Sequence, residues 1–339
     1  MAIILAIESS CDETAVAITK DGALLSNIVS TQIEVHRKYG GVMPEIASRL
    51  HAENIGVVLK EAIDVAGIKL EDVDAFAITR GPGLIGALHV GLQAAKTLSM
   101  IYHKPLIPVH HLAGHIYANE YIEPLVFPLL AIVVSGGNTE LVLMKEDMEF
   151  EVIGETRDDA IGECYDKVAR VLGLPYPGGI PIDKLAKEGK HTYQLSVPLK
   201  GENTLDFSYS GLKTNVINLV HYLEQKGEKI NVPDMCKSFQ DVAVGLVIDR
   251  AVKAVGMYDI KEVILAGGVS ANSYLRSEIV EKLKDYDVKV QIPPMWCCTD
   301  NAAMIAKVGE KLYEKGLFAD LSLGADPNWR IEDYQKYQN

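Results

Sequence analysis

The chain is predicted to fold as an α/β protein with two lobes, and three observations lead to this prediction. Its 339 residues exceed what one small core organises, so more than one domain is expected. Short apolar runs typical of strands alternate with longer helical patterns. A pattern of three strands and two turns also occurs twice, about 128 residues apart, and such an internal repeat predicts a duplicated architecture.

The first copy of the repeat opens the chain. Residues 2–7 are an apolar strand, and a polar turn follows with the sequence Glu8-Ser9-Ser10-Cys11-Asp12-Glu13-Thr14. A second strand covers 15–19, the pair Asp21-Gly22 predicts a hairpin turn, and a third strand covers 23–29. The first strand ends at a glutamate and has no basic flank, so it is not a signal peptide.

The second copy covers residues 129–153. A strand at 129–134 is followed by the small polar turn Ser135-Gly136-Gly137-Asn138-Thr139-Glu140, and further strands are predicted at 141–144 and 149–153. Two hairpins with small polar tips predict a cleft in which backbone N–H groups and hydroxyls hold phosphates. Two unrelated hairpins would explain the same pattern.

Between the two copies, residues 105–109 form a short strand, and the following helix carries His111 and His115. These histidines occupy positions i and i+4 on one helix face, where two imidazoles can hold one metal ion. A catalytic metal usually takes a third protein ligand, so the pair alone does not establish a metal site. The alternative is that both are partly buried histidines that cap a helix. Helices are further predicted at 44–65 and 84–100, with a strand at 73–79.

A formal G-x-G-x-x-G sequence spans Gly81 to Gly86, between a predicted strand and a helix. The dinucleotide-binding fingerprint also needs an acidic residue about 20 positions further on. No Asp or Glu occurs from Ala87 to Asn119. The dinucleotide interpretation is therefore rejected, and the glycines are expected to allow a tight turn and close helix packing.

The C-terminal half is predicted to continue with alternating helices and strands. Helices are expected at 158–172, from Asp183 onward, at 212–223, at 242–255 and after a Gly267-Gly268 turn, with strands at 263–265 and 288–292. The cluster Thr299-Asp300-Asn301 is expected to cap a last helix at 302–314. The predicted lobes are 1–128 and 129–300, with a C-terminal helix at about 301–325 packing back on the first lobe.

Composition excludes several classes of protein. Apolar residues make up 48% and charged residues 23%, and no apolar run approaches the length of a membrane span. Five cysteines without a C-x-x-C motif favour a reducing compartment, so we expect a cytoplasmic protein. The net charge of -13 repels nucleic acid on average, so an RNA substrate would require a local basic patch or a basic partner.

Eight motifs occur in order between residues 4 and 327. They are Glu8-Ser9-Ser10-Cys11-Asp12-Glu13-Thr14, Gly81-Pro82-Gly83-Leu84-Ile85-Gly86, the His111/His115 pair, Ser135-Gly136-Gly137-Asn138-Thr139, Tyr176-Pro177-Gly178-Gly179, Ser210-Gly211-Leu212-Lys213-Thr214, Gly267-Gly268-Val269-Ser270-Ala271-Asn272 and Cys298-Thr299-Asp300-Asn301-Ala302. Together they resemble the tRNA threonylcarbamoyladenosine transferase family, whose members were formerly named O-sialoglycoprotein endopeptidases. The resemblance implies the two-lobed actin-like ATPase (ASKHA) fold, with duplicated mixed-sheet lobes, of the actin–hexokinase–Hsp70 superfamily.

The same resemblance implies an activity. Members transfer the threonylcarbamoyl group of threonylcarbamoyl-adenylate to the N6 amine of the adenosine beside the anticodon (position 37), in tRNAs that read codons beginning with adenine. This acyltransferase would hold one divalent metal per subunit, Fe(2+) in preference to Zn(2+), with His111, His115 and Asp300 as ligands. The adenylate or another adenine nucleotide would lie along residues drawn from the second lobe: Val134, Ser135, Gly136, Gly137, Asn138, Asp166, Gly179, Asp183 and Asn272.

Two carboxylates at the first hairpin tip, Asp12 and Glu13, are candidates to position or deprotonate the attacking amine. Turn capping explains each of them equally well. Because Asp300 is nearly 200 residues from the histidines, only a closed two-lobed fold is expected to bring the three ligands together.

The chain departs from the family pattern at three positions. Val133 stands where archaeal and eukaryotic relatives carry a tyrosine that can reach the metal. Asn138 stands where bacterial members often have His. Ile180 interrupts the Gly-Gly-Pro sequence that is usual in the family. Val133 and Cys11 favour the bacterial branch. The expected partners are tRNA and accessory proteins: a degenerate paralogue and a small ATPase in bacteria, or a kinase-containing complex in archaea. No membrane partner is expected.

Three other functions share part of this pattern. A metallopeptidase of the zincin type has a Glu directly after its first His, whereas Leu112 follows His111 here. A small-molecule kinase of the same superfamily would share the cleft without needing the His pair. A non-catalytic nucleotide-binding paralogue would be expected to lack His111, His115 or Asp300, and all three are present.

Overall fold

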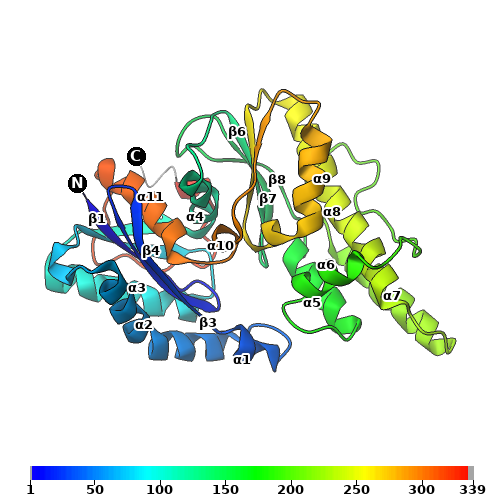
Figure 1. The fold of residues 1–339 in the computed structure, drawn as a ribbon, viewed down its shortest axis with the longest axis horizontal. Helices are drawn as coiled ribbons and strands as arrows, with labels where there is room; N and C mark the ends of the chain where they lie inside the picture. Colours follow the sequence, from blue (N-terminus) through cyan, green and yellow to red (C-terminus); the bar gives the residue numbers. More distant parts are fainter. Residues whose placement is uncertain (1, 335–339) are drawn as a thin grey trace. The chain divides into compact units, whose positions relative to one another are not determined.

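The computed structural model describes residues 2–334 and divides the chain into two compact units (Figure 1). Unit 1 comprises the chain up to Pro124 together with the segment from Thr299 onward, and unit 2 is Leu125–Cys298. The predicted boundary of the second lobe lies at residue 300. The chain instead enters unit 1 again at Thr299, so Asp300 belongs to the unit that contains the two histidines.

Unit 1 is built on a five-stranded mixed sheet with the order β3-β2-β1-β4-β5. The strands are β1 Ile3–Glu8, β2 Glu13–Lys20, β3 Ala23–Thr31, β4 Ala75–Gly81 and β5 Leu106–His110. The first three form the predicted antiparallel meander, and β4 and β5 join β1 in parallel. Parallel strands that point the same way end at one edge, so the last residues of β1, β4 and β5 lie near one another.

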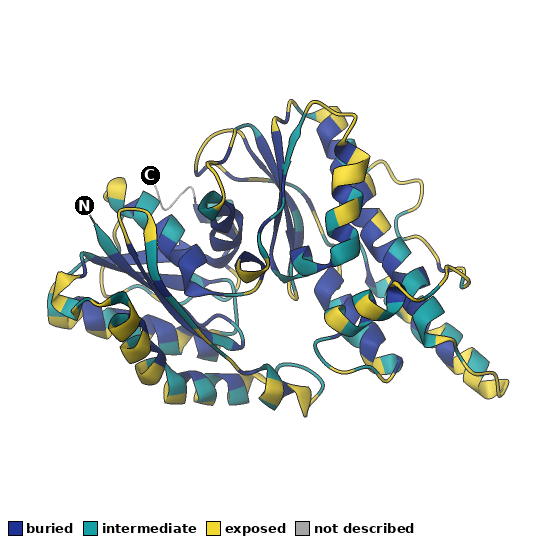
Figure 2. Ribbon diagram, in the orientation of Figure 1, coloured by how far each residue is buried: buried dark blue, intermediate teal, exposed yellow. Residues whose placement is uncertain are grey.

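Helices cover both faces of this sheet. The helices of unit 1 are α1 Ile33–Arg37, α2 Pro44–Ala66, α3 Ile85–Tyr102, α4 His111–Tyr117 and α11 Ala302–Glu314, with 3-10 turns η1 Leu70–Asp72 and η2 Ala118–Tyr121. Leu5 and Ile7 of β1 share a core with α2 and α3. The alternate residues face α11, where a Cβ on Gly309 would come within 3.3 Å of Ile4. β1 is therefore buried on both faces, as Figure 2 shows.

Unit 2 repeats the same strand order as β8-β7-β6-β9-β10. The strands are β6 Leu129–Val134, β7 Thr139–Met144, β8 Glu151–Glu155, β9 Glu262–Ala266 and β10 Lys289–Gln291. β6 and β7 are antiparallel, and β9 pairs in parallel with both β6 and β10. β6 thus corresponds to β1, and the predicted duplication extends to all five strands.

The helices of unit 2 lie around one large core, and all of them except the short last one contribute residues to it. They are α5 Ile161–Val171, α6 Gly179–Ala186, α7 Ser210–Gln225, α8 Val232–Met257, α9 Ser273–Leu283 and α10 Met295–Cys298, with the turn η3 Gly268–Ala271. Two predicted helix starts were wrong. Asp183 lies inside α6, which tolerates Pro181 because a first-turn proline loses no helical hydrogen bond. α8 begins ten residues before the predicted start, where Asn231 caps it ahead of Pro233.

Two further observations bear on the class of protein. No helix in the described part of the chain is long and apolar enough to cross a membrane. All five cysteines are free thiols, and four of them are buried.

Candidate functional site

Two histidines lie one turn apart in α4, the helix that directly follows β5. The His110 side chain caps this helix, because its Nδ1 accepts a hydrogen bond from the Leu112 N–H at 3.2 Å. The other ring nitrogen of His110, Nε2, donates to the Trp329 carbonyl at 2.8 Å. His111 and His115 are both buried, with ring centroids 4.7 Å apart. The predicted helix thus presents two imidazoles on one face.

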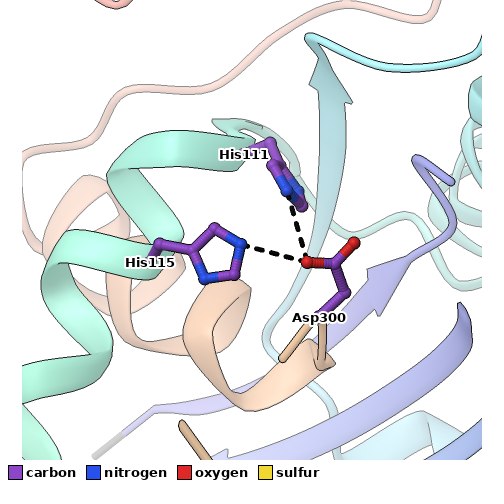
Figure 3. A group of neighbouring side chains, drawn as sticks. All are labelled: His111, His115 and Asp300. Carbon is purple, nitrogen blue, oxygen red and sulfur yellow. Dashed lines mark hydrogen bonds and ion pairs between the residues drawn. The ribbon is translucent and has the colours of Figure 1, made fainter. Parts of the chain in front are cut away.

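Asp300 reaches this pair from the C-terminal part of the chain (Figure 3). Its Oδ1 lies 3.0 Å from Nε2 of His115 and 3.5 Å from Nε2 of His111. The next residue, Asn301, caps α11 as predicted, because its Oδ1 accepts from the Met304 N–H. α11 packs against both α4 and β1, so one unit supplies all three side chains. The three side chains meet within unit 1, whereas a closed two-lobed fold was expected to be needed to bring them together.

The three side chains could hold a divalent metal ion. Among residues 2–334 they form the one group of this kind, with their ligand atoms all within 4.8 Å of one another. Donors that share an ion at about 2.0–2.2 Å lie roughly 3 to 3.5 Å apart in a tetrahedral site, and the two distances to Asp300 Oδ1 fall in this range. Two imidazoles and one carboxylate suit zinc or iron(II).

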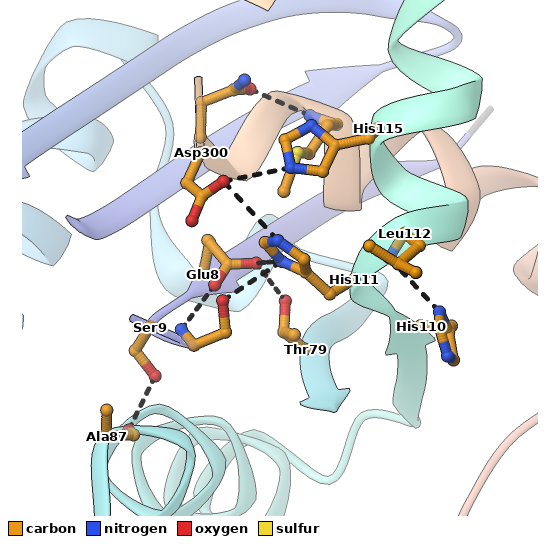
Figure 4. A network of polar contacts seen from close by, with 12 residues as sticks. Glu8, Ser9, Thr79, Ala87, His110, His111, Leu112, His115 and Asp300 are labelled. Atoms are coloured by element: carbon orange, nitrogen blue, oxygen red, sulfur yellow. Dashed lines mark hydrogen bonds and ion pairs between the residues drawn. The ribbon is translucent and has the colours of Figure 1, made fainter. Parts of the chain in front are cut away.

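Sequence reasoning missed Glu8, the last residue of β1, which lies beside His111 (Figure 4). Its side chain is fully buried, and its Oε2 is 3.1 Å from Nδ1 of His111. The Thr79 hydroxyl donates to the same oxygen at 2.6 Å, and the Ser10 N–H donates to Oε1 at 2.5 Å. A charged residue at the end of an otherwise apolar strand was the signal that could have identified it.

Electrostatics keep this group ionised. Burial lowers the pKa of His111, but the charges of Asp300 and Glu8 outweigh it and raise that pKa to about 9. Burial raises the pKa of Asp300, yet the charge of His111 and a hydrogen bond from His115 lower it to about 2. Glu8 behaves similarly, because His111 lowers its pKa against the effect of burial. Two carboxylates around the imidazoles therefore provide negative charge that favours a cation.

The tip of the first hairpin lies in the same unit as this cluster. His51 of α2 supports the tip, because its Nδ1 is 2.7 Å from the Thr14 hydroxyl and its Nε2 is 2.9 Å from the Cys11 carbonyl oxygen. Asp12 is buried, and the Thr31 hydroxyl donates to Glu13 at 3.1 Å. Burial, together with the charges of Asp12 and Asp300, raises the pKa of Glu13 well above its usual value.

The tip of the corresponding hairpin in unit 2 is packed closely by two glycines of neighbouring segments, and its own two glycines are exposed. A Cβ on Gly162 would lie 2.5 Å from the Ser135 carbonyl oxygen, and a Cβ on Gly267 would lie 2.5 Å from the Val134 carbonyl oxygen. Gly267 also has a φ of +88°, which favours glycine. Gly136 and Gly137 are exposed, and a Cβ on either would meet nothing within 4 Å. The backbone at this tip is accessible to a ligand.

The other predicted substrate residues of unit 2 lie on the helices around this tip. Asn272 caps α9 and donates through Nδ2 to Gln240, which in turn donates to Asp183 at 3.3 Å. Asp183 also accepts from the Ser273 hydroxyl. Asp166 accepts from the Gly178 N–H at 2.6 Å, next to Gly179 at the start of α6. Asp183 and Asn272 thus meet through Gln240, while Asp166 shapes the adjacent glycine loop.

Comparison with known proteins gives a consistent result. The family model TsaD, described as tRNA N6-adenosine threonylcarbamoyltransferase, matches residues 23–307. A protein of that name from Staphylococcus carnosus is 51% identical over 333 residues, which cover 98% of this chain and 97% of the relative. One from Listeria welshimeri is 51% identical over 334 residues, with the same coverage.

Solved structures of more distant proteins share the fold. Full-length HypF in its phosphate- and nucleotide-bound form matches with a TM-score of 0.62 and 16% identity, over 94% of this chain and 47% of that chain. Component A of the Acidaminococcus fermentans (R)-2-hydroxyglutaryl-CoA dehydratase matches with a TM-score of 0.55 and 17% identity, over 91% of this chain and 97% of that chain. With the duplicated five-stranded sheets, these matches establish the predicted two-lobed actin-like ATPase fold class.

Proposed function

The chain belongs to the tRNA N6-adenosine threonylcarbamoyltransferase family. From that membership we propose that it transfers the threonylcarbamoyl group of threonylcarbamoyl-adenylate to the N6 amine of adenosine 37. The substrates would be tRNAs that read codons beginning with adenine. The observation that carries the proposal is the meeting of His111, His115 and Asp300 within unit 1. A set of two buried imidazoles and a partly buried carboxylate has a clear use in a metal-dependent transferase.

We assign the three side chains as the protein ligands of one divalent metal, Fe(2+) in preference to Zn(2+). When bound, the metal would supply Lewis-acid polarisation of substrate oxygens. The chain contributes the orientation of the ligands, because α4 fixes the histidine spacing and the cap of α11 fixes the position of Asp300. Val133 is buried in β6 and supplies no fourth ligand atom.

The adenylate is assigned to unit 2. Its phosphate would lie against the open backbone of Gly136 and Gly137, where N–H groups can stabilise the negative charge of the leaving group. Val134, Ser135 and Asn138 complete this turn, which an Asn138 N–H to Ser135 Oγ hydrogen bond closes at 3.0 Å. We place the nucleoside near Asp166, Gly179, Asp183 and Asn272.

The reaction forms a bond between N6 of adenosine and the carbamoyl carbon, and breaks the bond from that carbon to the phosphate oxygen, so AMP leaves. The attacking amine loses one proton. We assign its positioning or deprotonation to Asp12 or Glu13 at the first hairpin tip. The raised pKa of Glu13 supports this assignment, because a carboxylate with a raised pKa is a stronger proton acceptor than an ordinary one.

The net charge of -13 supports a requirement for partners that bring basic surface to the tRNA. The relatives named above are bacterial, which supports the bacterial set, a degenerate paralogue and a small ATPase. We therefore expect the isolated chain to transfer slowly at physiological salt. Full turnover without any partner would contradict this part of the proposal.

The test combines metal content with transfer. Purified chain is given synthetic threonylcarbamoyl-adenylate, tRNA and the accessory proteins, with His111→Ala in parallel and His89→Ala as a matched control at an exposed position of α3. Metal-dependent labelling of the adenosine should be lost in the first variant and kept in the second. Bound metal without labelling, in the presence of all partners, would refute the proposed transfer.

A further inference from the structure

Glu8 is a buried carboxylate whose role in the proposed reaction is not yet assigned. It ends β1, its side chain is 0% exposed, and its ion pair is with His111. A buried carboxylate needs hydrogen bonds and a positive partner to remain charged. The Ser10 N–H and the Thr79 hydroxyl supply two of the hydrogen bonds, and the His111 ring supplies the remaining contact.

This contact determines which nitrogen of His111 carries a proton. Nδ1 of His111 faces two oxygens, Oε2 of Glu8 and Oγ of Ser10, each at 3.1 Å. The Thr79 hydroxyl already donates to that Glu8 oxygen, and a carboxylate only accepts, so Nδ1 must be the donor. When His111 loses one proton to bind a metal ion, the proton on Nδ1 is the one retained, and the lone pair is on Nε2, the atom 3.5 Å from Asp300.

We propose that Glu8 is a positioning residue for the metal centre: it holds His111 as the Nδ1–H tautomer and aims Nε2 at the ion. The inference rests on the metal site proposed above. Metal-bound histidines commonly donate their second nitrogen to a carboxylate, which fixes the ring and strengthens the ligand. His115 lacks this support, because its buried Nδ1 has no hydrogen-bond partner among residues 2–334. His111 is therefore the anchored ligand of the pair.

Unit 2 shows that the strand itself does not require a carboxylate at this position. Val134 ends β6, the counterpart of β1, and it is as fully buried as Glu8. It packs in the apolar core of unit 2. The charge at Glu8 therefore serves something particular to unit 1, where the ends of β1 and β4 and the start of α4 meet.

The first experiment measures the affinity of the full-length, metal-free chain for Co(2+), followed by its visible absorption. Glu8→Gln keeps the size of the side chain but removes its charge, and should weaken Co(2+) binding about 10- to 100-fold. Thr79→Val is the matched control, because it removes a hydrogen bond to Glu8 but leaves the carboxylate beside His111. It should change the affinity less than about threefold while lowering the thermal midpoint at least as much as Glu8→Gln does.

The outcomes separate the two proposals. Unchanged affinity in Glu8→Gln would overturn the inference, and so would equal losses in Glu8→Gln and Thr79→Val, which would reduce Glu8 to a support of the hairpin tip. If wild type does not bind Co(2+), or His115→Ala binds as tightly as wild type, the metal centre itself is refuted.

A second measurement needs no substitution at Glu8. Nitrogen-15 NMR of histidine-labelled wild-type chain loaded with Zn(2+) reports which ring nitrogen carries hydrogen. The inference predicts hydrogen on Nδ1 of His111 and metal on Nε2, with the signal identified by its loss in His111→Ala. Hydrogen on Nε2 of His111 would overturn the inference.

Discussion

The first hairpins of unit 1 and unit 2 belong to sheets with the same strand order, but the residues at their tips differ in chemistry. In unit 1 most side chains at the tip are buried: Glu8, Ser9, Ser10, Asp12 and Thr14 are all at most 8% exposed, while Cys11 and Glu13 are partly buried. In unit 2 the strand ends in an apolar Val134, and the exposed residues that follow are Gly136 and Gly137.

This difference indicates a division of labour within a duplicated scaffold. Carboxylates and imidazoles that converge in a buried place attract a cation, whereas exposed glycine backbone offers N–H groups to an anion. We infer that unit 1 acts through its side chains and that unit 2 acts mainly through its main chain. Substitutions at the two tips should therefore have different consequences.

The largest expected effect is at Asp300. Asp300→Ala removes a ligand atom and should lower the transfer rate by about 10³-fold or more, since metal assistance contributes several kcal/mol to transition-state stabilisation. Metal content should fall in parallel, while AMP binding without added metal should stay within about threefold of wild type. Transfer assays, metal analysis and calorimetry measure the three quantities. Equal losses of metal and AMP binding would break the division between the units.

The next effect is expected at the first hairpin tip. Glu13→Gln removes a candidate base while keeping its size, and should reduce the transfer rate about 10²-fold with normal metal content and adenylate binding. Asp12→Asn, assayed in the same way, shows which of the two carboxylates matters more. Thr31→Val is the control for Glu13, because it removes the hydrogen bond to this side chain, together with the one that the Thr31 hydroxyl accepts from the Ile33 N–H, and keeps the carboxylate. Near-normal transfer in both carboxylate variants would remove them from the chemistry.

Unit 2 can be tested by adding a methyl group to its main chain. A Cβ on Gly136 meets no protein atom within 4 Å, so Gly136→Ala should leave the fold intact but obstruct a phosphate at the backbone. The expected loss of AMP affinity is about tenfold, or roughly 1.4 kcal/mol. Gly245→Ala in α8 is the matched control, since its Cβ is equally free of contacts. If both variants bind AMP like wild type, the main chain at Gly136 is not the phosphate site.

The smallest effect concerns a side chain of unit 2 that we assign to stability alone. Asp158 accepts hydrogen bonds from the Tyr209 and Ser210 N–H groups at the start of α7. Asp158→Ala should cost about 1 kcal/mol of unfolding free energy, measured in urea, with AMP binding unchanged.

The same residue gives a pH dependence. Burial raises the pKa of Asp158, but hydrogen bonds from Ser208, Tyr209 and Ser210 outweigh it and lower that pKa. A lowered pKa stabilises the folded chain above the unfolded value near 3.8, and this stabilisation is lost as pH falls through the folded value. The difference between wild type and Asp158→Ala should therefore shrink in acid, and a constant difference would show that the charge does not matter.

Local patterns in the sequence determined the α/β class, the duplicated hairpin, the helix that carries His111 and His115, and the last helix at 302–314, which the structure confirms with the same bounds. Each of these depends on residues close together in the chain, through apolar periodicity, turn residues and caps. The order of eight motifs also identified the family, which the comparisons confirm.

Only the tertiary structure decided which distant side chains meet. Asp300 joins the histidines because α11 packs against α4 and β1 within unit 1. Glu8 meets His111 because the parallel strands of unit 1 end at one edge. The turn at Gly136 is packed closely by Gly162 and Gly267, while a Cβ on Gly136 itself would meet nothing within 4 Å. Such contacts join residues about 25 to 190 positions apart, and they arise from the packing of whole elements, which local patterns do not encode.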